Sequence, residues 1–170
     1  MRVLLDDPVK FFRKKEEGLL RTIFYFMAFL LFFIIMNEAM VRYGFVKYQP
    51  VAGVFESIAI NYAAVLSGFV LLSFITFVLS SMAGTKASLK QSIFVIAHSS
   101  TPLLLLGWVP FSVVKVIALI WSVLFLTLGI KIKMKFDYRK SVTIAALVLV
   151  ILFVVIVLSQ NYIITPIPLA

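Results

Sequence analysis

The sequence has no cysteine and a single histidine, His98. These absences exclude cysteine-ligated zinc, iron–sulfur clusters, disulfide bonds and thiol nucleophiles. Carboxylates are scarce too: the chain has seven, and all lie outside the long apolar runs or at their edges. Paired-carboxylate catalysis and metal-ion catalysis therefore lack the residues they require. We expect no catalytic residue, no metal site and no cofactor, and hence a protein that is not an enzyme.

The overall composition indicates a membrane protein. Of the 170 residues, 14% are charged and 63% are apolar, and the mean hydropathy is +1.13. Soluble domains are about half apolar and about a quarter charged. Five runs contain no Asp, Glu, Lys or Arg: 22–37, 57–85, 91–114, 116–130 and 141–170. A helix needs roughly 20 apolar residues to cross a bilayer, and these runs do not show the two-residue alternation of barrel strands.

We therefore predict an all-α, polytopic bundle of five transmembrane helices that forms a single membrane domain over residues 1–170. The predicted spans are 19–36, 58–82, 92–111, 113–130 and 142–158. Thirteen of the sixteen Lys and Arg residues lie in segments 1–21, 86–90 and 131–140, on one side of these spans. Positive segments stay cytoplasmic, which predicts the N-terminus inside and the C-terminus outside. This asymmetry explains the net charge of +9, so we expect no nucleic-acid partner.

The N-terminal segment 1–18 predicts a short amphipathic helix at the membrane surface. Asp7 can cap a helix that begins at Pro8, and Gly18 can end it. Phe11 and Phe12 would face the lipid. Neighbouring cations would face lipid phosphate, namely Arg13, Lys14 and Lys15. Such a helix either anchors the first span or docks a partner protein.

A second basic segment, 131–140, alternates cations with apolar residues before a mixed end. Its cations are Lys131, Lys133, Lys135, Arg139 and Lys140. Each cation close to an anionic surface contributes about 1 kcal/mol of attraction, so five attach the segment firmly to an anionic inner leaflet. The segment is either a topology signal alone or a docking surface for anionic lipids and acidic proteins.

The third predicted span holds the densest intramembrane polarity, the run His98, Ser99, Ser100, Thr101 and Pro102. Pro102 removes a backbone donor and predicts a kink, and the hydroxyls can satisfy the freed carbonyls. In this interpretation His98 has a structural role. An ionisable residue within a membrane is otherwise a candidate proton or ligand site, which would suit a small transporter or channel.

Small residues recur at four-residue intervals in the second predicted span. They are Ala59, Ala63 and Ser67, with Gly68 beside them. Such rows allow helices to approach closely. We expect this row to pack within the bundle, with a homodimer seam as the alternative.

The stretch from Gly84 to Phe153 resembles the Yip domain family of Ypt/Rab-interacting membrane proteins. The resemblance rests on the order of several short pieces: 88–91, the polar run 97–104, Trp108-Val109-Pro110, Ile120-Trp121 and 129–131. The opening Asp7 to Phe12 is similar to that of prokaryotic members. The resemblance implies five spans with a cytoplasmic N-terminus. The compactness of the chain and the lack of a secretory signal favour the prokaryotic or archaeal branch and predict a prokaryotic plasma membrane.

Eukaryotic members of that family act in vesicle trafficking and bind prenylated small GTPases through their cytoplasmic N-terminal part. In this chain the corresponding part is only about 18 residues long. A small GTPase is therefore a partner by analogy alone. We expect a non-enzymatic membrane protein that organises membrane or recruits partners at the cytoplasmic surface; the alternative is a small transporter or channel using the third span.

Overall fold

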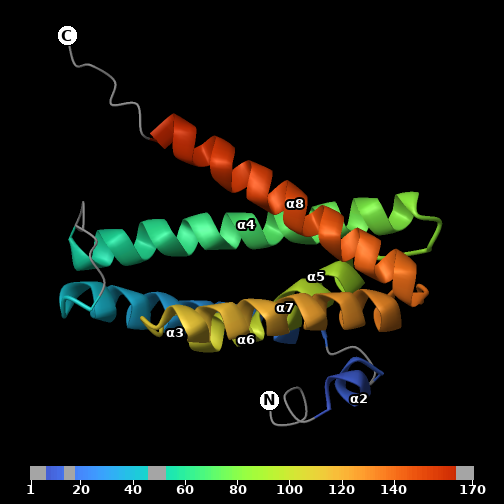
Figure 1. Ribbon diagram of the computed structural model, residues 1–170, viewed down its shortest axis with the longest axis horizontal. Helices are drawn as coiled ribbons and strands as arrows, with labels where there is room; N and C mark the ends of the chain where they lie inside the picture. Colours follow the sequence, from blue (N-terminus) through green and yellow to red (C-terminus); the bar gives the residue numbers. More distant parts are fainter. Residues whose placement is uncertain (1–6, 14–17, 46–52, 164–170) are drawn as a thin grey trace.

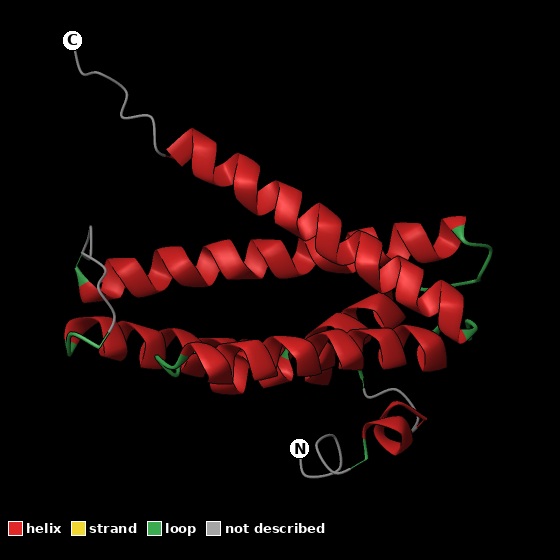
Figure 2. Cartoon of the chain, viewed as in Figure 1, coloured by secondary structure: helices red, strands yellow, loops and turns green. Residues whose placement is uncertain are grey.

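The computed structural model describes residues 7–13, 18–45 and 53–163, with side chains described as far as residue 154. Within these ranges every regular element is a helix (Figures 1 and 2). The helices are α2 (Pro8–Arg13), α3 (Leu19–Arg42), α4 (Val54–Met82), α5 (Leu89–Ser99), α6 (Thr101–Leu106), α7 (Ser112–Lys133) and α8 (Tyr138–Ile163). The all-α prediction is confirmed.

Three helices are long and apolar enough to cross a membrane: α3, α4 and α7. Helix α8 is 26 residues long. Large apolar side chains such as Leu20, Phe24 and Phe74 point outward and are exposed on the protein surface. Exposed apolar side chains are stable in hydrocarbon, and helices satisfy their own backbone polar groups there. The described part of the chain is therefore built for a lipid environment.

The helices are packed so that several of their ends lie at the same end of the molecule. Helix α5 contacts α3, α4 and α7, and α8 contacts α4 and α7. Figure 1 shows the start of α3, the end of α4, the start of α5, the end of α7 and the start of α8 toward the same end of the molecule. The core between them is apolar and includes Leu30, Val95, Ile130 and Val148.

The third predicted span differs from a single kinked helix over 92–111. The helix stops after Ser99 and resumes at Thr101, so the predicted disturbance beside Pro102 is present as an interruption at Ser100. Helix α6 then ends at Leu106, and 107–111 is turn and coil. The indole nitrogen of Trp108 donates to the carbonyl of Leu105 at 2.7 Å, which satisfies an acceptor at the helix end.

The row of small residues does not pack inside the described bundle. Ala59, Ala63 and Ser67 are exposed, and no atom lies within 4 Å of a Cβ built on Gly68. Helix α4 packs instead through larger residues on its other side, which include Tyr62, Leu66, Phe69, Ser73 and Thr76. The expectation of packing within the bundle is wrong, because bulkier side chains bury more apolar area. The homodimer seam stays a prediction.

Candidate functional site

His98 lies on the last turn of α5 and is only 2% exposed. Three aromatic rings from three helices surround it. The Tyr25 ring of α3 stacks on it at 4.9 Å with an interplanar angle of 17°, and the rings of Phe94 and Phe11 lie at 4.3 Å and 4.9 Å. We call these four residues, His98, Tyr25, Phe94 and Phe11, the histidine cluster. It joins α2, α3 and α5.

The polar atoms of this region bond mainly to nearby backbone. Nδ1 of His98 lies 2.8 Å from the carbonyl oxygen of Phe94, so this nitrogen carries a proton and donates it. The hydroxyls of Ser99 and Ser100 both donate to the carbonyl of Ile96, at 3.2 Å and 2.6 Å. A serine nucleophile would need its hydroxyl directed at the histidine. Both hydroxyls instead bond back to a carbonyl of their own helix, which also accepts the backbone N–H of Ser100.

Thr101 adds a contact between helices. Its hydroxyl and that of Tyr25 share a hydrogen bond of 3.0 Å, which links α3 to α6. Thr101 is fully buried, and Pro102 is buried beside it. The five predicted polar-site residues therefore lie together where α3, α5 and α6 pack, and the proposed transport role of this segment stays a prediction.

A cavity of about 120 Å³ touches part of this region. Ser99, Ser100 and Ser122 line it with apolar residues of α4, α7 and α8, while His98 and Thr101 do not line it. Ser122 Oγ is buried without a hydrogen-bond partner among the described residues. The cavity is small and mostly apolar, which suits packing better than passage of a hydrated ion.

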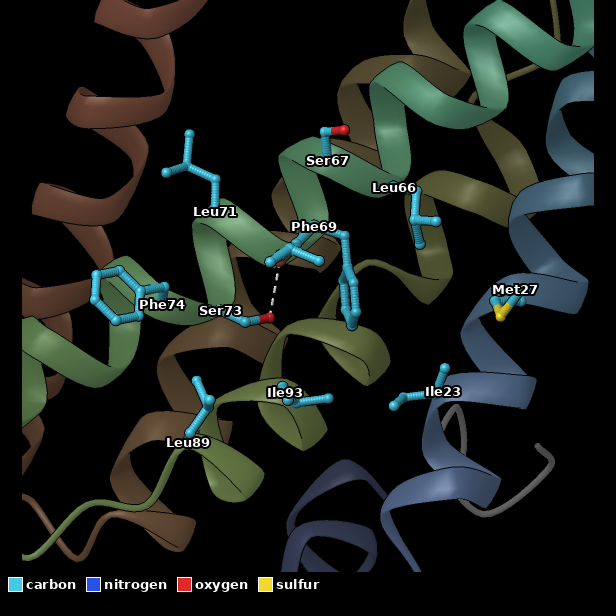
Figure 3. A pocket seen from close by; sticks show the side chains of 11 residues that line it. Ile23, Met27, Leu66, Ser67, Phe69, Leu71, Ser73, Phe74, Leu89 and Ile93 are labelled. Atoms are coloured by element: carbon cyan, nitrogen blue, oxygen red, sulfur yellow. Dashed lines mark hydrogen bonds between the residues drawn. The ribbon is translucent and has the colours of Figure 1, made fainter.

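A larger groove of about 740 Å³ lies between α3, α4 and α5 (Figure 3). Ile23 and Met27 of α3 face Leu66 and Phe69 of α4 across it. Its two serines, Ser67 and Ser73, donate their hydroxyls to carbonyls of their own helix at 2.8 Å. The groove therefore offers an apolar surface without a free polar group for recognition.

The N-terminal helix α2 differs in its end and in its environment from the lipid-facing helix that we predicted. Its start is confirmed: α2 begins at Pro8, and Asp7 accepts a hydrogen bond from the backbone N–H of Lys10 at 2.9 Å. The helix ends at Arg13, and Gly18 stands at the beginning of α3 instead of closing α2. The predicted contacts Lys14 and Lys15 lie outside the described residues.

Phe12 faces protein rather than lipid. Its side chain is 0% exposed and packs in a cluster with Phe94 of α5 and Phe125 of α7. The close fit depends on Gly129 of α7, because a Cβ there would lie 3.1 Å from a ring carbon of Phe12 and 2.8 Å from Val95. A buried protein site for an aromatic ring removes more of its surface from water than the headgroup zone would.

The docking of α2 brings the two predicted basic segments together. Helix α2 contacts α7, and Pro8 lines a cavity of about 310 Å³ with Trp121 of α7 and Tyr138 of α8. Exposed cations of both segments include Lys10, Arg13, Lys131, Lys135, Arg139 and Lys140. Lys133 is half-buried and lies over the ring of Phe94 at 4.8 Å. We call this surface, formed by α2 and residues 131–140, the basic end.

Two parts of the structure were missed by reasoning from sequence. Tyr25 lies in an apolar run, and nothing in its spacing indicated that it would contact His98. The buried Glu38 binds Arg42 at 2.8 Å and accepts a hydrogen bond from Ser57 of α4 at 2.9 Å. The four-residue spacing of Glu38 and Arg42 could have indicated that pair. The link to Ser57 required the packing of α3 on α4.

These features define a helical integral membrane protein with a closed aromatic and polar core and a basic end. A model of the Yip1 domain matches residues 1–159, and the chain belongs to this family. The predicted resemblance is thus confirmed, and the protein is a multi-pass membrane protein of a generally non-enzymatic family. No curated protein and no solved structure matches the chain.

Proposed function

We propose that this Yip1-domain protein recruits partner proteins at one membrane surface through its basic end. The observation that supports the proposal is the burial of Phe12 against α5 and α7. This contact holds α2 beside a segment more than a hundred residues away in the chain. The two carboxylates described nearby, Asp7 and Asp137, accept hydrogen bonds from backbone N–H groups at helix starts. Most of the other exposed charges described at the basic end are cationic.

The proposal includes a topology of five spans with the basic end in the cytoplasm. Helices α5 and α6 together form the third span, and α8 forms the fifth. The charge distribution along the sequence supports this arrangement, because thirteen of the sixteen cations lie in the segments 1–21, 86–90 and 131–140, on one side of the proposed spans. The prokaryotic plasma membrane is part of the same proposal.

The partner would present an acidic face, because a cationic surface attracts acidic surfaces and speeds their association. Family analogy suggests small GTPases of the Rab type. Anionic lipids of the inner leaflet would be held by the same charges.

Site-specific crosslinking in native membranes tests this proposal. A photoreactive residue replaces Tyr138, which is 60% exposed at the basic end. We expect a discrete crosslinked protein. Its yield should fall at least fivefold when Arg13, Lys131 and Arg139 are changed to glutamine, because each exposed charge contributes to attraction.

The matched control is Lys115→Gln, which removes an exposed cation at the start of α7, away from the basic end. This variant should leave the yield unchanged. If the triple variant inserted normally and captured the same partner at the same yield, recruitment by the basic end would be excluded.

A further inference from the structure

A small pocket at the basic end differs in chemistry from every other cavity described above. Its volume is about 280 Å³, and it lies between the turn after α4, the start of α5 and the end of α7. The lining residues are Thr85, Lys86, Gln91, Lys133, Met134 and Lys135. Half of them are lysines and none is a carboxylate, so the pocket concentrates positive charge.

Hydrogen bonds hold the framework of the pocket in place. Met134 is only 3% exposed, and its sulfur accepts a hydrogen bond of 2.8 Å from the hydroxyl of Ser80 near the end of α4. Oε1 of Gln91 accepts the N–H of Ser88 at 3.1 Å within the capping box of α5, which fixes the position of its amide. Thr85 donates its hydroxyl to the carbonyl of Ser80 at 3.0 Å. The pocket wall is thus held by one hydrogen bond from α4 to the end of α7 and by local hydrogen bonds at the end of α4 and the start of α5.

Lys135 has an unusual backbone conformation for its residue type. Its φ is +57°, and among the described residues it is the one non-glycine with a positive φ. It follows the C-cap residue of α7, Met134, at a position where helices commonly place glycine. The backbone therefore favours glycine here, and the chain instead places a cation at the pocket.

The pocket also lies at the right depth for a lipid headgroup. It lies at the ends of α4 and α7, whose last residues are Met82 and Lys133, and both helices are long and apolar enough to cross a membrane. A hydrocarbon core ends where such helices end, and the phosphates of the lipids lie directly outside it. Lysine is a common phosphate-binding residue, and an amide can add a neutral donor.

We propose that this pocket binds the phosphate of an anionic phospholipid headgroup. The lysines supply the charge, and Gln91 supplies a polar contact near the start of α5. This inference rests on the proposed attraction of anionic lipids to the basic end, to which Lys133 and Lys135 belong, and assigns that attraction to one specific site; partner capture in the crosslinking experiment is tested independently of it. Phosphate free in solution offers the same chemistry, so the experiment must separate the two sources.

Native mass spectrometry of the full chain in detergent measures the binding of phospholipids to the protein directly. Phosphatidylglycerol, phosphatidylcholine and inorganic phosphate are titrated separately. We expect one saturable phosphatidylglycerol, with phosphatidylcholine bound at least tenfold more weakly. Changing Lys86, Lys133 and Lys135 together to glutamine should weaken the phosphatidylglycerol affinity at least tenfold, since each cation contributes about fivefold.

A second triple variant removes the same charge from residues that do not line the pocket: Lys131, Arg139 and Lys140, each to glutamine. It should change the affinity by less than about twofold. Equal losses in both variants would show diffuse attraction and overturn the proposal. Displacement of phosphatidylglycerol by inorganic phosphate at comparable concentration would overturn the lipid as ligand.

The Lys135→Gly variant separates binding from folding. Glycine suits the positive φ, so we expect the thermal unfolding temperature to stay the same or rise. The affinity for phosphatidylglycerol should nevertheless fall about fivefold, because the charge is lost. A variant that is equally stable and binds the lipid as the natural chain does would remove Lys135 from the site.

Discussion

Two glycines in apolar helices, Gly129 and Gly68, differ in how closely other side chains pack against them. At Gly129 the missing side chain leaves room for Phe12 on one side and Val95 on the other. Gly68 has open space around it. The two glycines look alike in the sequence, and both lie within apolar helices. Only their surroundings distinguish a packing requirement from a tolerated small residue.

The same substitution at these two glycines gives a matched prediction. Gly129→Ala should lower the free energy of unfolding by about 1–3 kcal/mol, because the added methyl group overpacks the contact with Phe12 and Val95. Gly68→Ala should be neutral or stabilise by up to about 1 kcal/mol, since alanine favours the helix. Thermal unfolding in one detergent compares them. Equal effects would contradict the packing role of Gly129.

Phe12 gives the second prediction at this scale. Phe12→Ala should release α2, with a cost of about 3 kcal/mol for the lost buried ring. Hydrogen exchange of the α2 amides should then become fast while exchange in α7 stays slow. Lys10→Ala on the exposed side of α2 is the control. Unchanged protection of α2 in the Phe12 variant would show that other contacts hold the helix.

At the scale of elements, the interrupted pair α5 and α6 forms the centre of the bundle. Helix α5 contacts α3, α4 and α7, and α6 contacts α3 and α7. Beside the interruption, the hydroxyl of Ser100 donates to the carbonyl of Ile96, and the hydroxyl of Thr101 contacts that of Tyr25. The polarity of this segment therefore contributes to packing between helices.

A double-mutant cycle tests the link between α3 and α6. Tyr25→Phe keeps the ring on His98 and removes the hydroxyl, and Thr101→Val removes its partner. Each single change should destabilise the protein, and the coupling free energy should be about 0.5–1.5 kcal/mol, as for hydrogen bonds between membrane helices. Thermal unfolding of the four proteins gives this value. Strict additivity would show that the two hydroxyls do not interact energetically.

At the scale of the whole molecule, charge is separated along the bundle. Helix starts and ends that carry the cations gather at one end, where α2 also lies (Figure 1). The other end holds the buried Glu38, with its partners Arg42 and Ser57. One end can therefore attract anions, while at the other end the hydrogen bond from Ser57 to Glu38 joins α4 to α3.

The proposed topology predicts where the C-terminus lies. A reporter that is active only in the cytoplasm should be inactive when fused after Ala170, and the same reporter fused before Met1 should be active. Lys and Arg fix this orientation, so changing the cations of 131–140 to glutamine should increase the fraction of misoriented chains. Cytoplasmic activity of the C-terminal fusion would contradict five spans with the N-terminus inside.

The sequence by itself determined the helical class, the membrane environment and the separation of charge. Hydrocarbon forces backbone groups to bond within helices, and charges stay out of it, so both features follow from the local pattern of residue types. The cap at Asp7 and the disturbance at Pro102 also follow from neighbouring residues. These effects act within a turn or two of one helix.

Only the tertiary structure decided which faces meet. It buried Phe12 in protein, left Ala59, Ala63 and Ser67 outside, and set Tyr25 against His98. In helices that are apolar all round, the sequence pattern does not distinguish a face that meets another helix from one that meets lipid. Shape complementarity between distant segments makes that choice. The same packing places the start of α5 beside the end of α7 and so forms the pocket that Lys86, Lys133 and Lys135 line.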